Sequence, residues 1–268
     1  MVEISPLDQA LFLLTLVKQL KLDKSLFFQK LREEASGVQS TKTTSTTQVA
    51  KNTGASGKTT KTNQVVVSGA YVEVLVGGPY TRDKEEHPFG RAALHVVVGS
   101  KDITYDFGRY GKTWGTFDSE GEGVLNVWTS FKAYISGENS LGRTTTGFVY
   151  FLENAKAEAV IAHFDGIVAQ QKEQRKKTLS SARYVLPSNY HPTTNNCTTV
   201  TIAGAKVSGK SIVQNPAKFN EMRGLSFIER QAARTQSSPK DGVFIPADLQ
   251  AMLEANTEAP YDKKNVYK

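Results

Sequence analysis

The fold class of this chain is decided by the stretch AALHVVVGSKDITYDF, residues 92–107. Its two outer runs are rich in β-branched and aromatic residues, which favour strands, and the central GSKD predicts the turn of an antiparallel hairpin. If the hairpin is symmetric about those four residues, His95 stands opposite Asp106, and such opposed side chains lie about 5 Å apart at Cβ. A register shift of one residue would place Tyr105 or Phe107 there instead.

Strands and helices are expected on both sides of this hairpin. Further strand-like runs cover residues 71–76, 124–128, 144–151 and 184–186, and helical patterns cover 129–136, 154–177, 197–205 and 246–255. The two types mix without strict βαβ alternation, so the sequence predicts an α+β fold with an antiparallel sheet packed against helices. The last nine residues are polar, and we expect them to be loose.

Composition divides the chain into four segments. Residues 1–35 read as a helical unit, because SPLD at 5–8 has the form of a capping box and apolar residues recur at helical spacing behind it. Residues 36–62 are Ser, Thr, Gly and Lys with almost no large apolar residues, as in a flexible linker. We expect the main domain over 63–235 and a C-terminal extension over 236–268.

The overall charge is basic, with 33 Lys and Arg against 26 Asp and Glu, a net +7. The excess is concentrated in 36–63 and 170–183, where no aromatic residues interleave as a base-stacking surface would need, so no nucleic-acid partner is predicted. The apolar run Ala10–Val17 is too short to span a membrane and lacks the flanks of a signal peptide. The sequence therefore predicts synthesis in the cytoplasm and no stable membrane insertion.

The single cysteine, Cys197, lies in the run NNCTT at 195–199. One cysteine excludes an intrachain disulfide and a Cys-rich zinc site. Polar, helix-starting residues flank it, whereas a core cysteine is expected among Val, Leu and Ile. A thiol at a helix N-terminus meets unpaired N–H groups and the positive end of the helix dipole, which favour thiolate. The pattern is typical of a nucleophile, with a buried structural cysteine as the alternative.

A histidine and a carboxylate complete this hypothesis. Asp106 opposite His95 would accept the imidazole N–H and fix its tautomer, so that His95 serves Cys197 as general base and then as acid. Backbone N–H groups at the helix start, with the side chain of Asn195 or Asn196, would form the oxyanion hole.

The remaining histidines are weaker candidates. His191 lies in the loop before Cys197 and either assists the site or belongs to a turn with Pro192. The histidines and Asp106 have no recognisable metal-ligand spacing, so neither a metal nor another cofactor is predicted.

Three short segments carry a resemblance to a known family. LHVVVG at 94–99, YDFGRYG at 105–111, and YVL at 184–186 leading to Asn196-Cys197 resemble the circularly permuted branch of the NlpC/P60 cysteine hydrolase superfamily. That branch shares its papain-like core with the lecithin–retinol acyltransferase group. The similarity covers roughly residues 64–206 and implies a permuted papain-like core, with Tyr110 on the substrate side. These families often place His, Glu or Asn as the third catalytic residue, where this chain has Asp106, with Asp102 as its substitute.

The resemblance also implies a function. Members of the superfamily commonly cleave amide bonds in peptidoglycan stem peptides, and permuted members include lipid acyl hydrolases and transferases. A thiol hydrolase with a linker, a helical N-terminal unit and no signal peptide resembles the antibacterial toxins delivered by type VI secretion. That likeness implies a secretion-machine component and a cognate immunity protein as partners, and action in the periplasm of the target cell.

Two other functions stay open. A lipid acyl hydrolase or acyltransferase with the same Cys-His site would need a hydrophobic mouth, for which Trp114, Phe117 and Trp128 are candidates. A non-enzymatic basic module would bind an anionic polymer and use Cys197 only as a structural residue.

Overall fold

The computed structural model describes residues 69–82, 85–87, 89–115, 119–236 and 242–268. The helical unit predicted over 1–35, the linker over 36–62 and the side chain of Phe117 lie outside these ranges.

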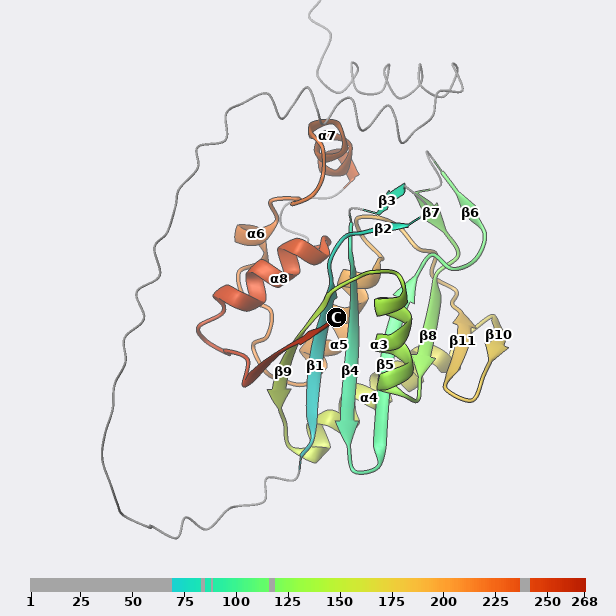
Figure 1. Cartoon of the computed structure of the whole chain (residues 1–268), viewed down its shortest axis with the longest axis vertical. Helices are drawn as coiled ribbons and strands as arrows, with labels where there is room; N and C mark the ends of the chain where they lie inside the picture. The colour runs from blue at the N-terminus through green and yellow to red at the C-terminus, as the bar shows by residue number, and fades with distance from the viewer. Residues whose placement is uncertain (1–68, 83–84, 88, 116–118, 237–241) are drawn as a thin grey trace, which may run out of the picture.

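One eight-stranded sheet organises the described chain, in the order β10-β11-β8-β5-β4-β1-β9-β12 (Figure 1). Every pairing in it is antiparallel. Its strands are β1 (Tyr71–Gly77), β4 (Arg91–Val98), β5 (Lys101–Gly108), β8 (Val124–Trp128), β9 (Thr145–Phe151), β10 (Glu173–Lys177), β11 (Ser181–Val185) and β12 (Lys263–Tyr267). Two short hairpins pair β2 (Tyr80–Arg82) with β3 (Glu85–His87), and β6 (Thr113–Trp114) with β7 (Glu120–Gly121).

Helices cover both faces of this sheet. In Figure 1, α3 (Phe131–Ser140) lies in front of it, whereas α4 (Asn154–Ala169) and α5 (Cys197–Val207) lie behind. The other helices are α6 (Pro216–Phe219), α7 (Phe227–Gln236) and α8 (Pro246–Ala255). Because both faces of the central strands are covered, β1 and β4 are apolar almost throughout. The fold is thus α+β, as the sequence predicts.

Side-chain alternation along β4 assigns its residues to two different cores. Leu94 and Val96 belong to the larger core with Phe164 of α4, and Ala93 belongs to the smaller core under α3. Gly204 lets α5 approach α4 closely, because a Cβ there would lie 2.5 Å from the Phe164 ring. His95, two residues beyond Ala93, therefore faces α3 and not α5.

The hairpin has a different register from the one predicted. Val98 pairs with Lys101, so the turn contains only Gly99 and Ser100, and Gly99 adopts the φ of +57° that a glycine tolerates best. His95 consequently lies opposite Thr104. The expectation that His95 faces Asp106 is wrong, because it assumed a four-residue turn and shifted the pairing by two positions.

Two other expectations are corrected. The helix predicted over 154–177 ends at Ala169, and residues 173–177 form the edge strand β10, paired with β11. The last nine residues are not loose, since β12 pairs with β9 along its length. The helix predicted over 246–255 is confirmed as α8, whose Leu249 and Leu253 enter the main core. Residues 242–268 therefore contribute to the same sheet and core as the preceding domain.

Candidate functional site

Cys197 is the first residue of α5, and Asn196 is its N-cap. The Asn196 Oδ1 accepts the Thr199 N–H at 3.1 Å, and the Thr199 Oγ1 accepts the Asn196 N–H at 2.8 Å, which completes a capping box. The Asn196 Nδ2 donates to the carbonyls of Pro192 at 2.5 Å and Phe244 at 3.0 Å. The Asn196 side chain therefore anchors the helix start, and the oxyanion role predicted for it has no free donor.

The thiol of Cys197 lies where α5 meets the first residues of β4. The backbone N–H of Ala92 points to its sulfur, the Arg91 guanidinium is a near charge, and the Thr198 hydroxyl lies 4.0 Å away. Burial raises the pKa of the Cys197 thiol, while Arg91 and the Ala92 N–H act in the opposite direction without cancelling it. Burial therefore works against the thiolate that the position at the helix start favours.

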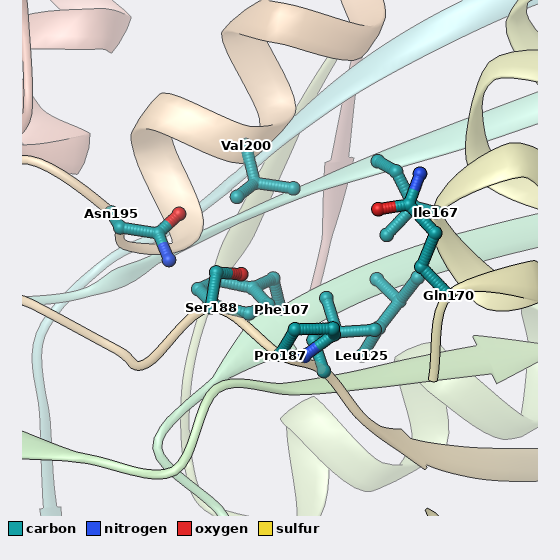
Figure 2. Close-up of a pocket in the computed structure, with 9 residues that line it drawn as sticks. Phe107, Leu125, Ile167, Gln170, Pro187, Ser188, Asn195 and Val200 are labelled. Carbon is teal, nitrogen blue, oxygen red and sulfur yellow. The ribbon is translucent and has the colours of Figure 1, made fainter. Parts of the chain in front are cut away.

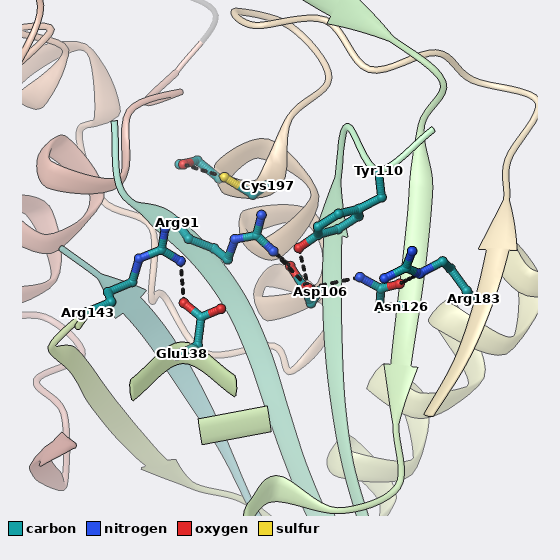
Figure 3. Close-up of polar contacts among 9 residues, drawn as sticks. Arg91, Asp106, Tyr110, Asn126, Glu138, Arg143, Arg183 and Cys197 are labelled. Carbon is teal, nitrogen blue, oxygen red and sulfur yellow. Dashed lines mark hydrogen bonds and ion pairs between the residues drawn. The ribbon is translucent and has the colours of Figure 1, made fainter. Parts of the chain in front are cut away.

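An arginine–aspartate pair stands beside the thiol. Figure 3 shows the Arg91 guanidinium between Cys197 and Asp106. The Arg91 Nη1 donates to both Asp106 carboxylate oxygens, at 2.8 and 2.9 Å, and Asp106 also accepts the Tyr110 hydroxyl at 2.6 Å and the Asn126 Nδ2 at 3.1 Å. Burial raises the pKa of the Asp106 carboxyl, and Arg91 opposes that shift. Asp106 is thus near Cys197, as predicted, but its partner is Arg91.

The polar network continues from Asp106 across the sheet. The Asn126 Oδ1 accepts the Arg183 Nε–H at 3.0 Å, so the Asn126 side-chain amide connects Asp106 on β5 with Arg183 on β11. The guanidinium carbons of Arg91 and Arg183 lie 4.7 and 5.3 Å from the centroid of the Tyr110 ring. The result is a cluster of cationic and aromatic side chains beside Asp106.

His95 belongs to a separate cluster under α3. Its Nδ1 lies 3.1 Å from Glu73 Oε2 and its Nε2 lies 3.1 Å from Asp102 Oδ1, while the ring stacks on Phe131 with centroids 4.0 Å apart. Asp102, the substitute third residue, does therefore contact His95. Both ring nitrogens are engaged, so neither is free to serve Cys197.

The predicted triad of Cys197, His95 and Asp106 is not assembled. Arg91 and His95 share one face of β4, but His95 lies four residues deeper, about 13 Å along the strand. On the β4 face that carries His95, Arg91 at the start of the strand is the residue whose charge acts on Cys197 at the first turn of α5. Arg91 thus occupies the position beside the thiol that was predicted for histidine.

The other predicted residues shape the loop before α5. The Asn195 Nδ2 donates to the Asn189 carbonyl at 2.6 Å, and the Asn195 and His191 backbones pair with each other. The His191 Nδ1 accepts the Thr193 N–H at 3.3 Å. The turn role that the sequence left open for His191 is the one these contacts support.

Arg91, Asn126 and Arg183 were missed by the sequence analysis. A signal was present for Arg91 alone, since it is a charged residue placed directly at the start of an otherwise apolar strand. Asn126 and Arg183 join the site through strand pairing of β8 with β5 and β11, which no local pattern reveals.

A largely apolar cavity of about 220 Å³ adjoins α5. Its apolar walls are Phe107, Leu125, Ile167, Leu186, Pro187 and Val200. Figure 2 shows Asn195 and Val200 closing it on the α5 side, one turn or less from Cys197. None of the residues predicted for a hydrophobic mouth lines this cavity: Trp128 packs on Tyr134 of α3, Trp114 is exposed on the β6–β7 hairpin, and Phe117 lies outside the described residues.

Comparison with protein-family models, with curated proteins and with solved structures finds no match to this chain. Within the described ranges, no three His, Cys, Asp or Glu side chains gather as they would around a metal ion. No helix in the same ranges combines the length and apolarity needed to cross a bilayer.

Proposed function

We propose that this chain is a cysteine hydrolase whose nucleophile is Cys197. The observation that carries the proposal is the placement of the only thiol of the sequence, partly exposed, on the first turn of a capped helix beside Arg91 and the Ala92 N–H. These are the groups that stabilise a developing negative charge on sulfur or on an acyl oxygen.

The reaction proceeds through an acyl-enzyme. The Cys197 sulfur bonds to the acyl carbon, and the electron pair of the carbonyl moves onto its oxygen, for which the N–H groups of Cys197 and Thr198 at the start of α5 are the candidate donors. The bond to the leaving amine then breaks, and the proton of the thiol ends on that amine. Water attacks the thioester, releases the acid and restores the thiol. Arg91 stays protonated at all accessible pH values, so it supplies charge and does not act as a base.

Amide bonds in peptidoglycan stem peptides are the substrate class we propose, on the strength of the sequence resemblance to permuted NlpC/P60 hydrolases. From the resemblance to secreted antibacterial toxins we further propose action in the periplasm of a target cell and an immunity protein that blocks the site. A second candidate, a lipid acyl hydrolase or acyltransferase, is favoured by the apolar cavity beside α5, since it could hold an acyl chain.

The test is digestion of purified sacculi by the wild type, Cys197→Ala and Cys197→Ser, with released fragments identified by mass spectrometry. Fragments that require the wild-type thiol support the proposal, and their masses identify the bond. Thr194→Ala, which alters an exposed residue of the preceding loop, is the matched control and should behave as the wild type. No release beside an active reference hydrolase would reject peptidoglycan, and the same proteins would then be assayed on phospholipids and thioesters.

A further inference from the structure

We propose that Arg91 binds a carboxylate carried by the substrate of Cys197. This inference rests on the proposed function, because it names the chemical group that the same site selects. It is carried by the hydrogen bonds of the guanidinium: Nη1 is committed to Asp106, whereas among the described residues neither Nε nor Nη2 has a hydrogen-bond partner. The Arg91 side chain is 21% exposed, so these donors are open to a ligand.

The geometry of the open donors favours a carboxylate. Nε–H and Nη2–H of a guanidinium are parallel and form the edge that matches the two oxygens of a carboxylate. Asp106 holds the opposite corner of the group and is itself only 3% exposed. The Tyr110 hydroxyl and the Asn126 amide hold Asp106 in turn. The fork is therefore positioned before the ligand arrives, which lowers the entropic cost of binding.

The charged side chains around Arg91 also favour an anionic ligand. Arg91 and Arg183 lie at the Tyr110 ring and Arg109 lies over the Tyr190 ring at 6.0 Å. Among the described side chains, these three guanidinium groups lie near one carboxylate with which Arg91 pairs, that of Asp106. Two acids on neighbouring elements of the described structure already have cationic partners, since Glu138 pairs with Arg143 and Glu122 pairs with Arg175. An anionic ligand would neutralise the excess positive charge of these arginines.

The sole cysteine allows a test that needs no catalysis. Iodoacetate and iodoacetamide alkylate the same sulfur and are nearly equal in size, but only the first carries a carboxylate. We would measure both rate constants by intact mass on the full chain, folded and in urea. The folded protein should show a ratio of iodoacetate to iodoacetamide rates about tenfold above that of the unfolded chain, as one charge-assisted hydrogen-bonded contact supplies.

Substitutions test whether Arg91 causes the change in the ratio of the two rates. Arg91→Gln should return the ratio to that of the unfolded chain, and Arg91→Lys should keep only part of it because the fork is lost. Lys101→Gln removes an exposed cation that pairs with Glu158 of α4, and it should leave the ratio unchanged. If Arg91→Gln does not fold, the comparison of folded and unfolded wild type still decides the proposal.

A competition experiment distinguishes a site for carboxylates from a site for phosphate. At constant ionic strength, acetate should slow the alkylation of folded wild type by iodoacetate, and inorganic phosphate should slow it less. Protection by phosphate alone would overturn the carboxylate assignment. Equal ratios in folded and unfolded protein, or a folded thiol that reacts with neither reagent, would overturn the Arg91 site itself. This readout is independent of fragment release from sacculi, so the two proposals can fail separately.

Discussion

The pairing of Asp106 with Arg91, and not with His95, makes a quantitative prediction for Asp106→Asn. The substitution keeps the shape of the side chain but removes the charge that faces Arg91. Removing one partner of a buried ion pair costs about 3–5 kcal/mol, but Arg91 is 21% exposed and can be hydrated, so we expect about 2 kcal/mol. The reverse change, Arg91→Gln, should cost about 3 kcal/mol, because it leaves the buried carboxylate with only Tyr110 and Asn126.

A double-mutant cycle separates the two possible partners of Asp106. The Arg91/Asp106 cycle should give a coupling free energy of about 2 kcal/mol, since the double variant has neither charge unpaired. The His95/Asp106 cycle should give less than about 0.5 kcal/mol, because no contact joins the two residues. Urea unfolding followed by fluorescence and circular dichroism supplies each free energy. Strong coupling of Asp106 to His95, with none to Arg91, would refute the hairpin register described above.

Three further predictions concern ionisation and close packing. Alkylation of Cys197 by iodoacetamide should keep accelerating above pH 9, because burial raises the thiol pKa, and a plateau below pH 8 would contradict this. Burial alone would raise the pKa of Glu73, but hydrogen bonds from His95, Asn265 and Tyr267 hold that pKa below its ordinary value of 4.5. The ionised Glu73 therefore stabilises the fold above pH 4.5, and this stabilisation is lost as the pH falls through the pKa of the folded state. The stability difference between wild type and Glu73→Gln in urea titrations should therefore shrink on acidification, and a constant difference would argue against the network. Gly147→Ala should destabilise by about 2 kcal/mol or more, since its Cβ would lie 1.9 Å from the fixed Glu73 Oε1, and an unchanged melting temperature would show that Glu73 is free to move.

The sequence predicts most of the sheet because its central strands are marked by local chemistry. Residues 92–98 are a buried apolar run, and the Pro at the start of 246–255 marks the helix α8 to the residue. The C-terminal strand β12 could not be predicted in the same way, because its KKNVY is polar and forms a strand only by pairing with β9. A polar strand of this kind depends on a partner that lies far away in the sequence.

The sequence predicts the position of Cys197 in the candidate site, but not the residue that lies beside it. Cys197 could be found because polar helix-start residues surround it, and the structure places it on the first turn of α5. The two-residue error in the hairpin register placed Asp106 opposite His95, whereas in the structure Asp106 pairs with Arg91, which the sequence analysis missed. The partner predicted for Asp106, His95, instead contacts Glu73 and Asp102.

The central claim, that Cys197 forms an acyl-enzyme, is tested most directly by the intact mass of the protein quenched in acid during digestion of sacculi. The account predicts that wild-type protein gains the mass of one acyl fragment, that hydroxylamine removes it, and that Cys197→Ala gains nothing. Release of fragments by a wild type of unchanged mass, or an adduct that also forms on Cys197→Ala, would contradict it.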